Sequence, residues 1–62
     1  MYKPQADRVI IEDLNHRKWI VYAKYGPVSF KRRIYKNYVV ALVYAQTLLD
    51  YYQIADLTEL SK

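Results

Sequence analysis

The periodicity of the apolar residues changes once along this chain, at Asn37. From there onward apolar side chains recur at steps of three and four residues, the spacing of one face of an α-helix. Asn37 is a preferred N-cap residue, so we expect a helix of about four turns that begins there and ends near Ile54. The expected inner face consists of Tyr38, Ala41, Leu42, Ala45, Leu48, Leu49 and Tyr52.

The segments before Asn37 are rich in β-branched and aromatic residues, which favour strands. A polar stretch ending at Lys18 has the length of a hairpin loop, in which Asn15 can adopt a positive φ. Gly26-Pro27 is a strong turn signal. The predicted strands are residues 8–14, 19–25 and 28–35.

Strict alternation along residues 28–35 predicts two faces for the third strand. Its apolar face would carry Val28, Phe30 and Ile34. Its outer face would carry Ser29, Lys31, Arg33 and Tyr35. Arg32 falls on the apolar face, so the register is imperfect there, and a helix beginning near Ser29 is the competing prediction.

The last residues have the spacing of a capping box, in which Asp56 caps and Glu59 reaches back. A short turn of helix from Leu57 to Leu60 would follow. The predicted fold class is α+β, with a small three-stranded antiparallel sheet (β-β-β) followed by one C-terminal helix packed on one face. We expect an N-terminal arm at residues 1–7 and a single domain at residues 8–62.

The composition predicts a small folded domain. At 62 residues the chain is close to the lower limit for independent folding, and it has no cysteine to form a disulfide. Hydrophobic residues make up 53 %, too many for a disordered tail. The longest apolar run, residues 38–45, is far shorter than the ~20 residues that span a bilayer, and no signal peptide is evident. We therefore expect a soluble, cytoplasmic protein that contacts no membrane.

The sequence offers no catalytic constellation. The single histidine, His16, lies in a predicted exposed loop, where nothing orients it for acid–base work. Glu12 and Asp13 are adjacent on a strand, so they point to opposite faces and cannot act as a pair. There is no glycine-rich phosphate loop, nucleophile elbow or metal-ligand spacing. We expect no enzymatic activity, no small-molecule substrate, no metal and no cofactor.

The cations are concentrated in the middle of the chain. Between Arg17 and Lys36 there are seven cations and no acid, so this segment carries +7 while its flanks sum to −3. Aromatic residues are interleaved with the cations, a pattern that suits a polyanion because phosphates bind the charges and bases stack on the rings. The predicted nucleic-acid-binding residues are Arg17, Lys18, Tyr22, Lys24, Lys31, Arg32, Arg33, Tyr35 and Lys36.

The basic segment also admits two alternative interpretations. Lysines and arginines protect sheet faces and edges from strand addition, which requires no ligand. Tyrosine, tryptophan and arginine anchor many protein interfaces, so the chain could instead be a protein-interaction module that docks on an acidic partner. Such a module would be a small regulator or inhibitor, encoded for example by a virus or mobile element.

The outer face of the predicted helix is unusually apolar for a surface helix. Leaving these side chains in water would forfeit much of the stability of so small a domain. A homodimer through the helix would bury them. The alternative is that the N-terminal arm or the segment containing Ile54, Leu57 and Leu60 folds back over this face. The predicted dimer interface is Val40, Val43, Tyr44, Thr47 and Tyr51.

The order of these features resembles a known class of module. Lys18-Trp19 opens the second strand, Lys31-Arg32-Arg33 makes the third strand basic, and an alanine-bearing helix follows. In layout the chain resembles the small DNA-binding modules, three strands plus a helix, at the N-termini of some phage-type integrases. The resemblance implies DNA binding, although the helix here is more apolar than such a module requires.

Overall fold

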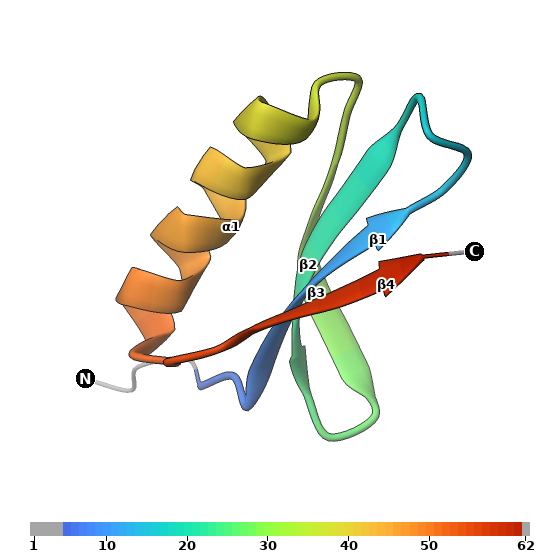
Figure 1. Cartoon of the computed structure of the whole chain (residues 1–62). Helices are drawn as coiled ribbons and strands as arrows, with labels where there is room; N and C mark the ends of the chain where they lie inside the picture. The colour runs from blue at the N-terminus through green and yellow to red at the C-terminus, as the bar shows by residue number, and fades with distance from the viewer. Residues whose placement is uncertain (1–4, 62) are drawn as a thin grey trace.

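The computed structural model describes residues 5–61, which form one sheet and one helix. The elements are β1 (Arg8–Asp13), β2 (Trp19–Tyr25), β3 (Val28–Tyr35), α1 (Tyr38–Tyr52) and β4 (Leu57–Ser61). The strand order in the sheet is β3-β2-β1-β4, and α1 lies across one face (Figure 1). The prediction of an α+β fold with one helix packed on a sheet is confirmed.

The predicted three-stranded antiparallel sheet is wrong in strand number and in orientation. β1, β2 and β3 pair in antiparallel fashion, but a fourth strand, β4, pairs with β1 in parallel. β3 runs in the same direction as β1, so the helix provides the crossover that a parallel strand requires. The sheet is therefore mixed.

Residues Leu57–Ser61 form the strand β4 and not the predicted final turn of helix, because they pair with the edge of β1 that β2 leaves open. Val9, Ile10 and Ile11 of β1 are all buried, which is typical of a central strand with a neighbour on each side. In β4, Leu57 pairs with Val9 and packs against the core, and Glu59 pairs with Ile11. The capping box does not form, and the segment is extended instead.

A β-bulge in β3 changes which side chains face the helix. Val21 pairs with Arg33 and Ala23 pairs with Phe30, so both Lys31 and Arg32 lie opposite Tyr22. Lys31 has φ 61°, a left-handed conformation. The extra residue reverses the alternation beyond it. The predicted outer positions of Arg33 and Tyr35 are therefore wrong, because both side chains lie on the helix side of the sheet. The predicted inner position of Ile34 is also wrong, because Ile34 lies on the other face and is 59 % exposed.

The predicted start of the helix is confirmed. The Asn37 side-chain oxygen accepts hydrogen bonds from the backbone N–H groups of Val39, at 2.8 Å, and Val40, at 3.3 Å. The helix ends at Tyr52, and Gln53 takes a left-handed conformation with φ 57°. Its N–H donates to the Asp50 carbonyl and the Ile54 N–H to the Leu49 carbonyl, the two bonds of a Schellman motif.

The core lies between α1 and the central strands. The predicted inner face of the helix is largely confirmed, since Ala41, Ala45, Leu48 and Leu49 are buried and Leu42 and Tyr52 pack against them, whereas Tyr38 is 37 % exposed. The sheet contributes Val9, Ile11, Val21 and Ala23. The small alanines let the helix backbone approach the sheet closely.

The two hairpin connections follow their sequence signals with one difference. Gly26 has φ 58°, as hairpin turns require, and connects β2 directly to β3. In the β1–β2 loop the positive φ falls on His16, not on Asn15. The Asn15 side chain instead accepts a hydrogen bond from the Arg17 N–H at 3.0 Å.

The predicted arm, residues 1–7, is described only from Gln5, since Met1 to Pro4 lie outside the described residues. The Asp7 N–H donates to the Lys24 carbonyl at 2.8 Å, and its carboxylate accepts from the Gly26 N–H at 3.0 Å. This part of the arm is therefore held against the β2–β3 hairpin. Among residues 5–61 there is no helix long and apolar enough to cross a membrane.

Candidate nucleic-acid interface

The cations lie mainly on the β3 side of the sheet. Lys31, Arg32 and Arg33 belong to β3, which is an edge strand. Trp19 pairs with Tyr35, so the residues just before β2 and just after β3 meet at one end of the sheet. The cations at that end are Arg17, Lys18 and Lys36.

The carboxylates lie mainly on the other half of the sheet. Glu12 and Asp13 are on β1 and Glu59 is on β4. Within residues 5–61 no lysine or arginine lies within salt-bridge distance of a carboxylate, and the one contact at this distance joins His16 Nδ1 to the Asp13 carboxylate at 2.9 Å. The β3 cations are therefore not neutralised by close partners in the described chain.

A groove between β3 and α1 brings these cations together with tyrosines. It has one wall from the edge strand and one from the helix. No carboxylate lines it. The lining residues are Lys31, Arg32, Arg33, Tyr44, Thr47, Leu48, Tyr51 and Tyr52. We call this feature the β3–α1 groove.

Tyr44 fixes the geometry of one end of the β3–α1 groove. Its hydroxyl donates to the Lys31 carbonyl at 3.0 Å, which satisfies a backbone group at the bulge. The Arg33 guanidinium carbon lies 5.4 Å from the centre of the Tyr44 ring, within cation–π range. The Tyr35 ring contacts the same ring at 5.7 Å. Helix and edge strand are thus joined by polar and aromatic contacts.

Tyr51 and Tyr52 form the other end of the groove. Their ring centres lie 4.8 Å apart at an interplanar angle of 87°, and Tyr52 also contacts Phe30 edge to face. Tyr51 is half-exposed, whereas the Tyr52 hydroxyl is buried and has no hydrogen-bond partner among the residues that the structure describes. Burial raises the pKa of Tyr52, and the neighbouring tyrosines raise it further.

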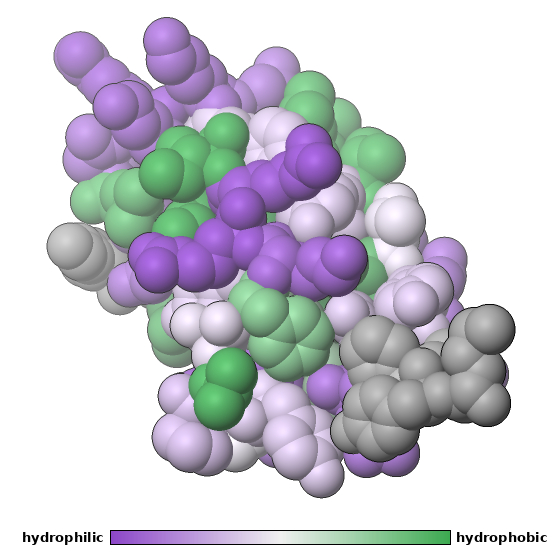
Figure 2. Space-filling model, turned by 180° about the vertical axis from the view of Figure 1, so that it is seen from behind, coloured by the Kyte–Doolittle hydropathy of each residue, from purple (hydrophilic) through white to green (hydrophobic). Residues whose placement is uncertain are grey.

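The sheet face away from the helix holds the other predicted residues. Tyr22 and Lys24 lie there, but Glu12 and Ser29 line the same shallow depression. The face also carries isoleucines, of which Ile34 is exposed. Figure 2, which views the molecule from behind Figure 1, shows a band of hydrophilic side chains that crosses between apolar patches. The structure therefore does not bring Tyr22 and Lys24 into the β3–α1 groove.

The predicted dimer interface divides into two parts. Val40 and Val43 are exposed together with Val39, which is 65 % exposed, and we call these three residues the valine patch. The other predicted residues, Tyr44, Thr47 and Tyr51, line the groove. The alternative cover by the segment around Leu57 and Leu60 is wrong, because that segment forms β4 beside β1.

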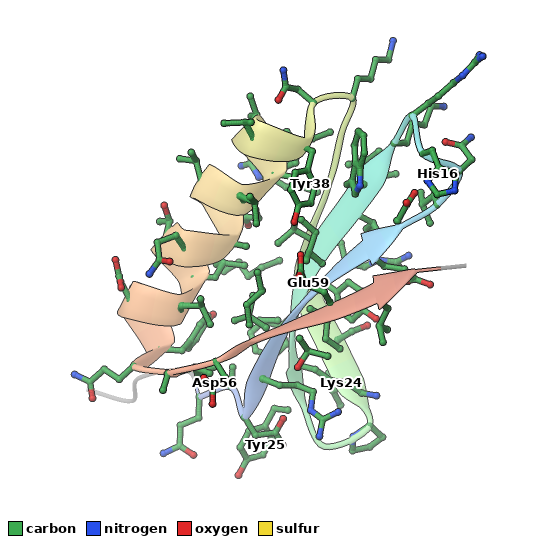
Figure 3. The ribbon with its side chains drawn as sticks, viewed as in Figure 1. His16, Lys24, Tyr25, Tyr38, Asp56 and Glu59 are labelled. Atoms are coloured by element: carbon green, nitrogen blue, oxygen red, sulfur yellow. The ribbon has the colours of Figure 1, made fainter. Side chains whose placement is uncertain are left out.

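A contact that the sequence analysis missed joins α1 to β4. The Tyr38 hydroxyl donates to the Glu59 carboxylate at 2.5 Å, and the Tyr38 ring contacts Trp19 at 5.6 Å (Figure 3). This hydrogen bond, with desolvation and the Glu59 charge, raises the pKa of Tyr38. Only the pairing of β4 with β1 brings Glu59 to this position, so no local pattern indicates it.

Nothing in the described residues forms a metal centre. Residues 5–61 contain no group of three or more histidine, cysteine, aspartate or glutamate side chains placed to hold an ion. The chemistry that the site offers is cationic, aromatic and hydrogen-bonding.

The fold and the site define a small α+β domain with a basic, tyrosine-lined groove beside an edge strand. No protein-family model matches the chain, and no curated protein or solved structure matches it. The resemblance to integrase modules therefore rests on layout alone, and β4 departs from their three-stranded layout.

Proposed function

We propose that this chain is a small, non-enzymatic, cytoplasmic nucleic-acid-binding protein. The observation that supports the proposal is the β3–α1 groove, in which three cations from β3 and three tyrosines from α1 converge and no carboxylate intervenes. Arg17, Lys18 and Lys36 would extend the contact at the end of the sheet where β2 begins and β3 ends.

The physical basis is complementarity to a polyanion. Lysine and arginine side chains without close acidic partners attract phosphates and release the counterions bound to them. Binding of this kind weakens steeply as salt rises, by a slope of roughly 0.7 to 0.9 in the double-logarithmic plot for each phosphate contacted. The position of the acids on β1 and β4 would orient the β3 side of the sheet toward the ligand.

The test is a fluorescence-anisotropy titration with labelled oligonucleotides at several salt concentrations. The variant is Arg32→Ala combined with Arg33→Ala. The matched control removes the same charge at Arg8 and Lys24, which pair directly across β1 and β2 and do not line the β3–α1 groove. We expect the groove variant to bind all sequences more weakly and with a shallower salt slope, and the control to bind nearly as the wild type does.

Two results would overturn the proposal. The first is no binding of any oligonucleotide at low salt, which would leave the cations as protection for the edge strand. The second is an equal loss of affinity in the groove variant and the control, which would mean that net charge alone acts. Thermal unfolding of both variants checks that their folds are intact.

The proposal includes a homodimer formed through the valine patch. Val39, Val40 and Val43 are exposed on α1, and burying a valine stabilises by roughly 1.5–3 kcal/mol. The patch carries no charge, so two copies can meet on it without like-charge repulsion. Sedimentation equilibrium should give twice the chain mass, and Val43→Glu should give the monomer. A monomeric wild type at micromolar concentration would contradict this assembly.

The second candidate function is a protein-interaction module that docks on an acidic partner. The observation that favours it is the apolar surface outside the groove, where Ile34 and Leu60 are exposed on β3 and β4. Arginine-flanked apolar surface is common at protein interfaces. If the wild-type protein bound no oligonucleotide but bound an acidic protein tightly, this function would be favoured.

A further inference from the structure

We infer that the β4 edge of the sheet binds an extended, basic segment of another protein. The segment pairs with β4 as an added strand and places an arginine side chain in a pocket beside Trp19 and Tyr38. The inference goes beyond the proposed nucleic-acid binding and concerns the other edge of the sheet. No lining residue of this pocket also lines the β3–α1 groove, so the two sites can be tested separately.

The pocket lies between the first residue of α1 and the strands β2, β1 and β4. Its volume is about 270 Å³. Sites for drug-sized molecules are larger, roughly 300–1,000 Å³, so a pocket of this size suits one long side chain. The lining residues are Ile11, Asp13, Trp19, Tyr38, Glu59 and Leu60. We call this feature the Trp19–Tyr38 pocket.

The walls of the Trp19–Tyr38 pocket combine two features that attract a cation. The ring centres of Trp19 and Tyr38 lie 5.6 Å apart at an interplanar angle of 56°, so the two rings form a corner. The face of an aromatic ring attracts cations, and the indole of tryptophan does so most strongly. The lining also carries two charged side chains, Asp13 and Glu59, and both are negative.

Both carboxylates have acceptor positions for a ligand. Glu59 accepts the Tyr38 hydroxyl, and Figure 3 shows the two side chains pointing toward one another. Asp13 accepts the His16 N–H at 2.6 Å and contacts the His16 ring. These contacts use fewer than the about four lone-pair positions of each carboxylate. A guanidinium group matches the pocket, because it binds carboxylates through two N–H groups and stacks on aromatic rings.

β4 is the edge strand that borders the Trp19–Tyr38 pocket. Within the described residues it has a strand neighbour on one side, β1 (Figure 1). An edge strand presents N–H and C=O groups to an extended chain that lies alongside it. When a peptide adds to such an edge, backbone hydrogen bonds give affinity and pockets for alternate side chains give specificity. A segment paired with β4 would direct every second side chain to the helix side, where the pocket lies.

The two edges of the sheet differ in their protection against strand addition. β3 carries a lysine and a bulge, and the Tyr44 hydroxyl already donates to the Lys31 carbonyl. β4 (Leu57–Ser61) contains no lysine, arginine or proline, and it pairs with β1 without a bulge. The protected β3 edge of a second copy is a poor occupant, and its head-to-tail pairing with β4 would give an open filament. The occupant is therefore a segment of another protein.

The experiment titrates the chain with a short peptide of valine and threonine that carries one central arginine. Trp19 is the single tryptophan, so its fluorescence reports binding at the pocket itself. A second peptide has citrulline in place of arginine, which removes the charge and keeps the shape. A third has methyl groups on alternate backbone nitrogens, which blocks strand pairing. We expect the arginine peptide to bind at least about tenfold more tightly than either of the others.

The protein variants test the pocket with a matched control. Glu59→Gln keeps the shape of the side chain and removes its charge, so it should weaken binding of the arginine peptide by about tenfold and leave the citrulline peptide unchanged. Glu12→Gln removes the same charge from the far face of the sheet, outside the pocket, and should bind as the wild type does. Amide hydrogen exchange in β4 should slow when the arginine peptide binds. Thermal unfolding checks the fold of each variant.

Each outcome supports or overturns the inference. Equal binding of the arginine and citrulline peptides, or equal losses in the two variants, would overturn the assignment of the pocket. Undiminished binding of the methylated peptide would overturn strand addition. No fluorescence change with any peptide would overturn the whole inference, while oligonucleotide binding would stand on its own titration. Assembly of the chain beyond a dimer, lost in Glu59→Gln, would show that a second copy is the occupant and overturn the assignment to another protein. Slower exchange in β4 and a selective loss in Glu59→Gln support it.

Discussion

The hydroxyl of Tyr38 donates a hydrogen bond to the carboxylate of Glu59, 2.5 Å away, and so joins the first turn of α1 to β4. The two residues are 21 positions apart in the sequence. Figure 3 shows them pointing toward one another across the space between helix and strand. This contact holds the last strand of the sheet to the start of the helix.

We expect Tyr38→Phe to lower the free energy of unfolding by about 1 kcal/mol, since the phenylalanine keeps the contact with Trp19 but loses the hydrogen bond. Urea denaturation measures the change. A double-mutant cycle that combines Tyr38→Phe with Glu59→Gln should give an interaction energy between the two side chains that favours the folded state. If the effects of the two single variants add without coupling, the hydrogen bond contributes nothing to stability.

The pKa values of Tyr38 and Tyr52 are both raised in the folded chain, which predicts a loss of stability at high pH. Below pH about 10, the ordinary tyrosine value, both groups keep their protons in either state. Above it the unfolded chain loses these protons first, so the free energy of unfolding falls as pH rises through the folded pKa values. Denaturation at a series of pH values should show a shallower fall in the Tyr38→Phe, Tyr52→Phe double variant.

Tyr52→Phe should leave the protein as stable as the wild type or stabilise it by about 1 kcal/mol. The hydroxyl is buried without a partner in the described residues, and an unsatisfied buried polar group is costly. The matched control is Tyr44→Phe, which removes a hydroxyl that donates to the Lys31 carbonyl. That variant should lose about 1 kcal/mol by the same measure. Equal losses in both would show that the Tyr52 hydroxyl has a partner in solution.

The left-handed conformation at the end of α1 predicts that changing glutamine to glycine stabilises the protein at that position but destabilises it in the middle of the helix. Gln53 holds φ 57° just after α1, where glycine is favoured, so Gln53→Gly should raise the free energy of unfolding by about 1 kcal/mol. Gln46 lies in the middle of the helix, where glycine costs about 1 kcal/mol. Thermal unfolding of the two variants should shift in opposite directions. A shift of the same sign in both would contradict the left-handed end of α1.

Alanine substitutions in β4 distinguish the strand from the helical turn predicted at these residues. Leu57 packs against the core and Leu60 is exposed, so Leu57→Ala should cost about 2 kcal/mol and Leu60→Ala less than about 0.5 kcal/mol. In a helical turn the two leucines would share one face, and similar losses would be expected. Chemical denaturation gives both values, and equal losses would argue against β4.

Local patterns determined much of this fold. Asn37 caps the helix because its short side chain reaches the N–H groups of the first turn, and the three- and four-residue spacing from Tyr38 to Tyr52 sets which face is buried. Gly26-Pro27 determined the turn between β2 and β3. The concentration of cations between Arg17 and Lys36 is likewise a property of the sequence alone.

Tertiary structure decided what depends on distant partners. Val9, Ile10 and Ile11 form a continuous buried run, and that run was the available signal that β1 is central. The second partner of β1 depends on the crossover through α1, which returns the chain to the sheet beside β1. Residues Leu57–Ser61 therefore form a parallel strand there and not the helical turn expected from the sequence.

The bulge at Lys31 decided the candidate site. A single extra residue in β3 reverses the direction of every later side chain, because strand alternation has a period of two. It turns Arg33 and Tyr35 toward α1 and assembles the β3–α1 groove. The sequence determined which residues are cationic and aromatic, and the pairing of β3 with β2 decided which of them meet.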